Sequence, residues 1–256
     1  MFNKSIVIIG SGNIATCFGK ALIDAGMSIQ AIYSRNFEHA KNLAHLLKAQ
    51  AVSLIDELPV DADFYMIAVN DSSITEISDQ LKVNGIVFHC SGNTSIEAIK
   101  SHKNHGVIWP LQTISKNFEL NIKAIPLCIE GNIEDTTNTL TDLANTISEK
   151  VVQMNSQQRK YAHLAAVFAN NFSNHLFDIS AQLLKDHQLD FDLLRPLILE
   201  TARKVQFANP SEMQTGPAIR QDHTTVNEHL KMLNDHPDYK NMYDILSKSI
   251  IELNKK

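Results

Sequence analysis

The sequence predicts an α/β fold, in which a doubly wound parallel sheet is followed by an all-helical carboxyl-terminal domain. The first 150 residues alternate strand and helix patterns with short connections, and repeated βα units build parallel sheets with helices on both faces. After Asn155 no convincing strand pattern occurs. With 256 residues the chain can form two domains. We therefore expect a first domain over residues 1–154 and a second over residues 155–256.

The expected sheet begins with Ser5 to Ile9, a continuous apolar run that is typical of a parallel strand buried on both faces. Further strands are expected at residues 28–33, 51–52, 64–69, 86–89, 106–109, 125–129 and 150–153. Helices are expected at residues 13–25 and 37–48 and from about Ser73. Thr94 and Glu97 have the Thr-x-x-Glu spacing of a capping box, which predicts a short helix after Thr94.

The second domain is expected to be built from helices alone. One long helix is predicted from about Ser156 to Leu184, and the others near residues 191–206, 223–233 and 238–253. Pro210, Gly216 and Pro217 mark the extended non-helical stretch between them.

Charge and composition exclude several classes of protein. The net charge is −5; residues 1–150 hold 16 acidic and 11 basic side chains, and the rest hold 12 of each. Neither part has the basic excess of a nucleic-acid-binding protein, and no apolar run approaches the ~18 residues of a membrane span. The cysteines, Cys17, Cys90 and Cys128, are odd in number and widely spaced, which indicates free thiols and a cytoplasmic protein. No metal site is predicted, because His102 and His105 lack further ligands at a recognisable spacing.

A glycine-rich turn joins the first strand to the first helix. Its sequence is G-x-G-x-x-A, and it directly follows a strand and opens a helix, which is the context that dinucleotide binding requires. Free N–H groups at the helix amino terminus and the positive end of its dipole would hold a pyrophosphate. The expected binding residues here are Gly10, Ser11, Gly12, Asn13 and Ile14.

The residues after the second strand indicate which dinucleotide binds. Sites for NAD place an acidic residue there, on the ribose 2′-hydroxyl. This chain has Ser34 and Arg35 instead, and no acid. A hydroxyl and a planar guanidinium suit a 2′-phosphate, so we expect NADP(H). Arg35 could alternatively cap a surface turn or stack on the adenine.

The motifs at residues 6–13, 68–71 and 89–92 resemble those of the 6-phosphogluconate dehydrogenase-like superfamily, which includes pyrroline-5-carboxylate reductases. Together with residues 111–113, 165–171 and 215–222, they resemble most closely the bacterial NADP oxidoreductases that have a Rossmann-like domain and an uncharacterised helical domain. The resemblance covers nearly the whole chain.

This resemblance implies positions for the nicotinamide half of the cofactor. Val69 and Asn70 would lie by the nicotinamide ribose, and His89 and Ser91 would approach the ring. The sequence also departs from the family pattern. Many relatives carry His-Pro where this chain has Trp109 and Pro110, and many dehydrogenases carry a lysine four residues before the asparagine that Asn171 could match, where this chain has a valine.

At 100° per residue the predicted long helix has an apolar and a polar face. Its apolar face, expected to be core or a dimer interface, consists of Leu164, Phe168, Phe172, Leu176 and Ile179. Its polar face contains His163, Asn170, Asn171, Asn174 and Asp178. Asparagine is a poor helix former, so the amides are explained either by substrate binding, for which we select Asn170 and Asn174, or by an amide network against the neighbouring domain.

His163 is the candidate general acid, with Asn171 as its catalytic companion, because an imidazole donates protons near neutral pH. His89, which the resemblance places nearer the nicotinamide, is the second candidate, and the alternative is a purely structural histidine. Arg220, in the loop at residues 215–220, could clamp a substrate carboxylate, or it could form an ion pair with Asp222 or with a partner subunit. Cys90 is interpreted as an inert buried thiol.

The sequence as a whole predicts an NADPH-dependent oxidoreductase that transfers a hydride between its cofactor and a small, anionic keto or imino compound between the two domains. The alternative is a non-catalytic NADP(H)-binding redox sensor, which the missing lysine favours. We expect a homodimer in either case, with no nucleic-acid or membrane partner.

Overall fold

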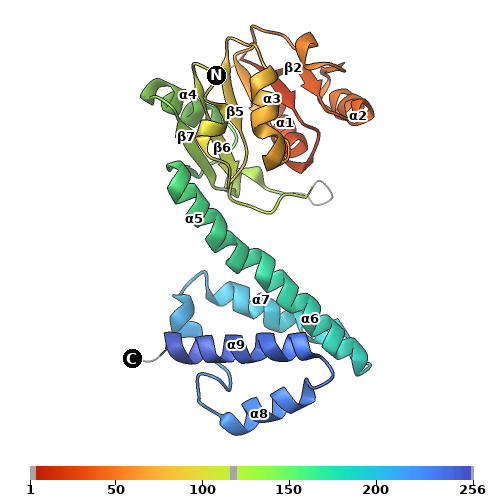
Figure 1. The fold of residues 1–256 in the computed structure, drawn as a ribbon, viewed down its shortest axis with the longest axis vertical. Coiled ribbons are helices and arrows are strands. Elements are labelled where there is room, and N and C mark those ends of the chain that lie inside the picture. The colour runs from red at the N-terminus through yellow and green to blue at the C-terminus, as the bar shows by residue number, and fades with distance from the viewer. Residues whose placement is uncertain (1–3, 116–119, 255–256) are drawn as a thin grey trace. The chain divides into compact units, whose positions relative to one another are not determined.

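The computed structural model describes residues 4–115 and 120–254 and divides into two compact units, Met1–Ala169 and Asn170–Lys256. Figure 1 shows the α/β elements of the first unit and the helices of the second. The α/β fold class with a helical carboxyl-terminal part is confirmed. The division falls inside the long helical segment, whereas the strands end before residue 154. A domain boundary at residue 154 stays a prediction.

The first unit contains an eight-stranded sheet with the order β3-β2-β1-β4-β5-β6-β7-β8. Its strands are β1 (Ser5–Ile9), β2 (Ser28–Tyr33), β3 (Gln50–Val52), β4 (Phe64–Ile67), β5 (Ile86–His89), β6 (His105–Pro110), β7 (Leu127–Gly131) and β8 (Val151–Gln153). Strand order reverses at β1, which lies between β2 and β4. Ligands of open α/β sheets bind at such a switch point, beyond the carboxyl ends of the strands.

One strand pair corrects the expectation of an all-parallel sheet: β7 runs antiparallel to β6, with Ile108 opposite Ile129. All other neighbours in the sheet are parallel. Parallel neighbours need a long crossover, usually helical, whereas antiparallel neighbours can be joined by a loop. The described part of the β6–β7 connection contains only one short 3-10 turn, Ile122–Ala124.

Both faces of the sheet are buried. Ile6 and Ile8 pack into a core on one face, and Val7 and Ile9 pack into a second core on the other. The first core includes side chains of helices α1 (Asn13–Asp24), α2 (Phe37–Leu47) and α4 (Glu134–Asn145), and the second includes those of α3 (Ile74–Gln80). Sequence analysis did not identify α4. Burial on both faces explains why the central strands β1 and β4 are almost entirely apolar.

The predicted capping box at Thr94 is wrong. The short helix is a 3-10 turn, Ile96–Ile99, and the side chain that caps it is Ser95, which accepts a hydrogen bond from the Glu97 N–H. Thr94 instead uses its hydroxyl to accept a hydrogen bond from the Ser91 hydroxyl at 3.0 Å. The loop after β5 is therefore held by its own side chains.

The predicted long helix is present but contains an irregularity. Helix α5 (Ser156–Ala166) continues through a π-helical segment, Val167–Phe172, into α6 (Ser173–Asp186). Because a π-helix bonds i to i+5, the helical wheel at 100° per residue does not hold across this segment. The remaining helices are α7 (Arg195–Lys204), α8 (His223–Met232) and α9 (Pro237–Leu253). The stretch expected to be non-helical includes a 3-10 turn at Pro210–Met213.

The apolar face of the long helical segment is mostly exposed in the single chain. Leu164, Phe168, Phe172 and Leu176 are exposed, and Ile179 is buried. The interpretation as core is therefore wrong for the first four, and the dimer interface stays a prediction. No helix in the described ranges combines the length and the apolar character needed to cross a membrane.

Candidate functional site

The turn between β1 and α1 has a backbone that only glycine tolerates at Gly10. This residue has φ +122°, and a Cβ there would lie 2.2 Å from the Ala68 carbonyl oxygen. Its N–H donates to the Tyr33 carbonyl oxygen at 2.8 Å. Gly10 therefore lets β1 turn sharply between the ends of β2 and β4.

Gly12 has a different explanation. Its φ is −81°, in the ordinary extended region, and a Cβ there would meet no atom of the described residues within 4 Å. It caps α1 without any side-chain hydrogen bond to the helix. Among the described residues no contact explains a glycine at this position, and the open space suits an anion that approaches the first N–H groups of α1.

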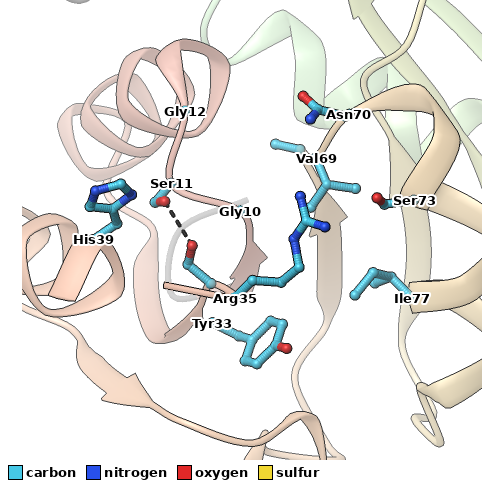
Figure 2. A pocket seen from close by; sticks show the side chains of 12 residues that line it. Gly10, Ser11, Gly12, Tyr33, Arg35, His39, Val69, Asn70, Ser73 and Ile77 are labelled. Atoms are coloured by element: carbon cyan, nitrogen blue, oxygen red, sulfur yellow. Dashed lines mark hydrogen bonds between the residues drawn. The ribbon is translucent and has the colours of Figure 1, made fainter. Parts of the chain in front are cut away.

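A hollow of about 300 Å³ opens on one side of this turn. Figure 2 shows the Arg35 side chain extending from the end of β2 toward Val69 and Ser73, with His39 of α2 beside Ser11. The hydroxyls of Ser11 and Ser34 are hydrogen-bonded at 2.9 Å. None of the described residues that line the hollow is acidic. Arg35 and His39, together with the bonded hydroxyls of Ser11 and Ser34, are the kinds of side chain that suit a 2′-phosphate.

A second hollow of about 290 Å³ shares Gly12, Ala68, Val69 and Asn70 with the first. Its other lining residues are Asn13, Ile14, Asp71, Cys90, Ser91, Gln112 and Ile114. The two hollows therefore meet at the glycine turn, at the sheet's switch point. This arrangement fits NADP(H), with the adenosine phosphate in the first hollow and the nicotinamide in the second.

His89 lines neither hollow, because its side chain is fully buried. Its Nδ1 accepts a hydrogen bond from the Ser91 N–H at 3.2 Å, which leaves Nε2 to donate to the Ser95 carbonyl oxygen at 3.4 Å. Desolvation, followed by the nearby Arg159 charge, lowers the pKa of His89 to about 3. Its position indicates that it shapes the loop after β5. Burial likewise raises the pKa of the Cys90 thiol, which fits the inert interpretation.

Acid is expected to destabilise the first unit through His89. Its folded pKa, about 3, lies below the reference value of 6.5, so below pH 6.5 the unfolded chain binds the proton more strongly and stability falls as the pH falls. The loss from pH 7 to pH 5 should be about 2 kcal/mol. Urea unfolding followed by Trp109 fluorescence measures it. His89→Asn should remove most of this pH dependence, and His45→Asn, at an exposed site, should not; equal slopes in all three proteins would contradict the assignment.

His163, on α5, lies against the first unit's loop after β5. Its ring centre is 5.8 Å from that of Trp109, with the planes tilted by 48°. A Cβ on Gly92 would lie 2.5 Å from Trp109 and 2.8 Å from the His163 ring. Glycine at position 92 thus permits the contact between these rings. The His163 nitrogens have no hydrogen-bond partner among the described residues, and the side chain is partly exposed, so they are accessible to a ligand.

The other predicted site residues belong to the second unit. Asn170 and Asn171 lie in the π-helical segment, and Asn174 lies in the first turn of α6. All three are exposed. π-helical turns recur at functional sites, but the roles of these amides stay predictions.

Arg220 is exposed in the loop before α8, where Gly216 and Gln221 have positive φ angles of 111° and 54°. Within the described residues it forms no ion pair with Asp222. Asp222 instead caps α8 by accepting hydrogen bonds from the Thr225 N–H and hydroxyl, which lower its pKa. The carboxylate clamp stays a prediction.

Sequence reasoning missed His39 and the contact of Trp109 with His163 beside Gly92. His39 could have been found, because it lies four residues after Arg35 in the first turn of the next helix, where anions bind. The contact across Gly92 had no sequence signal, because it joins residues more than 50 positions apart. Among the described residues, no three potential metal ligands cluster together.

Two family models match the chain. Residues 5–87 match the model described as NADP oxidoreductase coenzyme F420-dependent, and residues 125–250 match a domain of unknown function, DUF2520. The two matches correspond to the glycine-turn half of the sheet and to its last strands with the helical part.

Known proteins resemble the chain to different extents. A crystal structure from Bacteroides fragilis, described as a "putative NADP oxidoreductase", is 38% identical, with a TM-score of 0.89 and 98% of each chain covered. The 1-pyrroline-5-carboxylate reductase of Streptococcus pyogenes is 13% identical, with a TM-score of 0.64 and coverage of 97% and 98%; this likeness shows the fold alone. Glutamyl-tRNA reductase of Methanococcus maripaludis is 28% identical over 147 residues, which are 54% of this chain and 38% of that relative. The match thus spans less than two fifths of the curated relative.

The fold and the paired hollows define a Rossmann-type oxidoreductase with a dinucleotide site at the switch point of its sheet. The chain belongs to the family of NADP oxidoreductases represented by the Bacteroides fragilis protein. NADP(H) is the cofactor, as the sequence predicts.

Proposed function

We propose that the protein is an NADPH-dependent reductase of a small, anionic keto or imino compound. The observation that carries this proposal is the position of His163, whose ring lies against Gly92 and Trp109. Gly92 directly follows Ser91, which lines the second hollow. The His163 ring thus contacts the residue that directly follows Ser91, and Ser91 is part of the wall of the hollow that suits the nicotinamide.

Each residue around the hollows has a defined task in this proposal. Ser34, Arg35 and His39 hold the 2′-phosphate, and the N–H groups after Gly12 hold the pyrophosphate. Asn70 and Asp71 face the nicotinamide ribose, where an amide and a carboxylate bind hydroxyls. Val69 and Ser91 line the wall beside the ring.

NADPH, when bound, supplies the hydride. The protein must then neutralise the charge that develops on the substrate oxygen or nitrogen, and His163 donates the proton. We assign Asn171 to orienting the substrate, and Asn170, Asn174 and Arg220 to binding its polar and anionic groups.

The missing His-Pro pair of related dehydrogenases has an explanation in this proposal. The strand position that carries histidine in many relatives carries Trp109 here, and Trp109 contacts His163. An imidazole therefore still lies beside that position, but α5 provides it instead of β6. An imine substrate would depend less on proton donation by His163 than a keto substrate would, because an imine can bind already protonated.

Oxidation of NADPH, followed at 340 nm, tests the proposal. The panel should hold small keto acids, cyclic imino acids and aldehydes, with NADH in parallel and NADPH binding confirmed first by thermal shift. Turnover of one anionic compound with preference for NADPH is the expected result. Binding of NADPH without turnover of any compound would instead favour the redox sensor. Val167 supports that alternative, because it stands where many related dehydrogenases have a lysine, four residues before Asn171.

Arg35 is expected to set the preference for NADPH over NADH. Arg35→Ala should weaken NADPH binding by about 10- to 100-fold, since a charge-assisted hydrogen bond contributes roughly 1.5–3 kcal/mol. Calorimetric titration measures it, and NADH is the internal control because it lacks the 2′-phosphate. His39→Ala should act in the same direction, because the His39 imidazole lines the same hollow. Equal losses for the two cofactors would show that Arg35 contacts a part they share.

The exposed apolar side chains of the long helical segment support a homodimer. Leu164, Phe168, Phe172 and Leu176 would be covered by a second copy. Light scattering after size exclusion should give twice the mass of 28.6 kDa, and Phe168→Glu should shift the protein toward monomer. The three free cysteines fit a cytoplasmic location.

A further inference from the structure

Arg159 is a buried charge outside the cofactor hollows. It lies on α5, four residues before His163, and its side chain is 1% exposed. One Nη forms an ion pair with Glu130 at the end of β7. The other donates to the Thr94 carbonyl oxygen at 2.6 Å and to the Ser156 hydroxyl at 3.2 Å. We call Arg159, Glu130, Ser156 and Thr94 the Arg159 cluster.

The cluster holds the start of α5 against the end of β7 and against the segment after β5. The Ser156 N–H and hydroxyl donate to the two carboxylate oxygens of Glu130, each at 2.8 Å. The Ser156 hydroxyl oxygen also accepts a hydrogen bond from the Ile96 N–H at 3.1 Å. Because Ser156, Arg159 and His163 follow the three- and four-residue spacing of one helix face, the contacts that fix Arg159 also fix the direction of His163.

The same cluster reaches the wall of the second hollow. Thr94, whose carbonyl accepts from Arg159, donates its N–H to the Ser91 hydroxyl at 2.9 Å, and that hydroxyl donates to the Thr94 hydroxyl. Ser91 lines the hollow. Two successive hydrogen bonds thus connect the buried Arg159 guanidinium to Ser91, a residue beside the position expected for the nicotinamide.

Stability alone does not explain this cluster. The Nε of Arg159 is buried and has no acceptor among the described residues. Replacing a buried ion pair by apolar side chains is often neutral or stabilising. A buried charge with an unpaired N–H is therefore better explained by the geometry that it fixes.

We infer that Arg159 is a positioning residue: it sets the distance between the His163 imidazole and the Ser91 wall of the second hollow. This inference rests on the proposed reductase function for its catalytic consequence. Its structural consequence, the contact of His163 with Trp109, can be measured independently of activity.

The chain contains a single tryptophan, Trp109, so its fluorescence reports on this contact. An imidazole packed against an indole quenches the indole's emission. Emission excited at 295 nm and measured at one fixed pH should therefore be higher in His163→Gln than in the wild type. The difference between these two proteins is the His163-dependent quenching.

Arg159→Lys tests the inference, because lysine keeps the charge but cannot bond Glu130, Ser156 and Thr94 from one plane. The His163-dependent quenching should fall at least about twofold, and kcat should fall about 10- to 100-fold, as expected when a catalytic group is misplaced by about 1 Å. The KM for NADPH should change less than about threefold, because the first hollow is untouched. Arg195→Lys, at an exposed ion pair with Asp192, is the matched control and should change nothing.

Glu130→Gln is the second variant, in case Arg159→Lys does not fold. It retains hydrogen bonding to Ser156 but loses the charge that pairs with Arg159. The His163-dependent quenching and kcat should both fall, by less than in Arg159→Lys, and the KM for NADPH should again change little. Wild-type quenching and kcat in a folded variant would overturn the inference. If the wild type reduces no compound, the proposed function fails, and the fluorescence measurement alone tests the positioning role of Arg159. Unchanged His163-dependent quenching in both variants would then overturn the inference.

Discussion

Gly12→Val is expected to weaken NADPH binding strongly while the protein stays folded. A Cβ at this position meets no atom of the described residues within 4 Å, and the backbone has an ordinary φ of −81°. The valine methyl groups would occupy the space through which the pyrophosphate approaches the first N–H groups of α1. Loss of two charge-assisted hydrogen bonds should weaken binding by about 100-fold or more, ~3 kcal/mol. Isothermal titration calorimetry with NADPH measures this loss.

The neighbouring glycine provides the opposite control. Gly10→Ala would place a Cβ 2.2 Å from the Ala68 carbonyl oxygen at a φ of +122°, so it should lower stability by several kcal/mol, as strain and overpacking do. Gly12→Val should change the free energy of unfolding by only about 1 kcal/mol. Tight NADPH binding by a folded Gly12→Val protein would refute the placement of the pyrophosphate.

His163→Gln is expected to reduce kcat by about 10²- to 10⁴-fold, the usual contribution of a positioned general acid. Glutamine has a similar length and can form a hydrogen bond, but it cannot donate a proton to an alkoxide or amine. The NADPH dissociation constant should stay within about threefold of the wild-type value, since His163 lines neither hollow. Stopped-flow measurement of NADPH oxidation in a single turnover separates the chemical step from product release.

The size of the kcat loss in His163→Gln depends on whether the substrate is a keto or an imino compound. A keto substrate needs the proton during the reaction, so the full loss applies. An imine that binds in protonated form brings its own proton, and the loss should then be less than about tenfold. His187→Gln, at an exposed position, is the matched control. A wild-type kcat with a keto substrate would remove His163 from the mechanism and leave the family assignment intact.

Much of the fold was predictable because it depends on local patterns. Three strands, Ser5–Ile9, Ser28–Tyr33 and Ile86–His89, have the predicted bounds, because the apolar residues of buried parallel strands form short local patterns that the sequence shows directly. The predictions failed where tertiary contacts determine the local structure. The direction of β7 is such a case, since it follows from the length and path of a connection and not from the strand's residues.

In the predicted site, too, some features could be predicted from local sequence and others could not. The glycine turn, Ser34 and Arg35 were identified because a phosphate-binding turn is a continuous segment with fixed spacing. The π-helical segment Val167–Phe172 was not, because it shifts the face of each later residue without leaving a composition signal.

The sequence by itself determined the α/β class, the NADP(H) cofactor and the glycine turn, because each depends on residues that are adjacent or regularly spaced along the chain. The tertiary structure alone decided what surrounds His163. Its neighbours Gly92 and Trp109 come from the loop after β5 and from β6, and the buried Arg159–Glu130 pair joins α5 to β7. Contacts among segments so far apart arise from how the sheet and helices pack, since burial selects which side chains meet, and no spacing in one sequence encodes them.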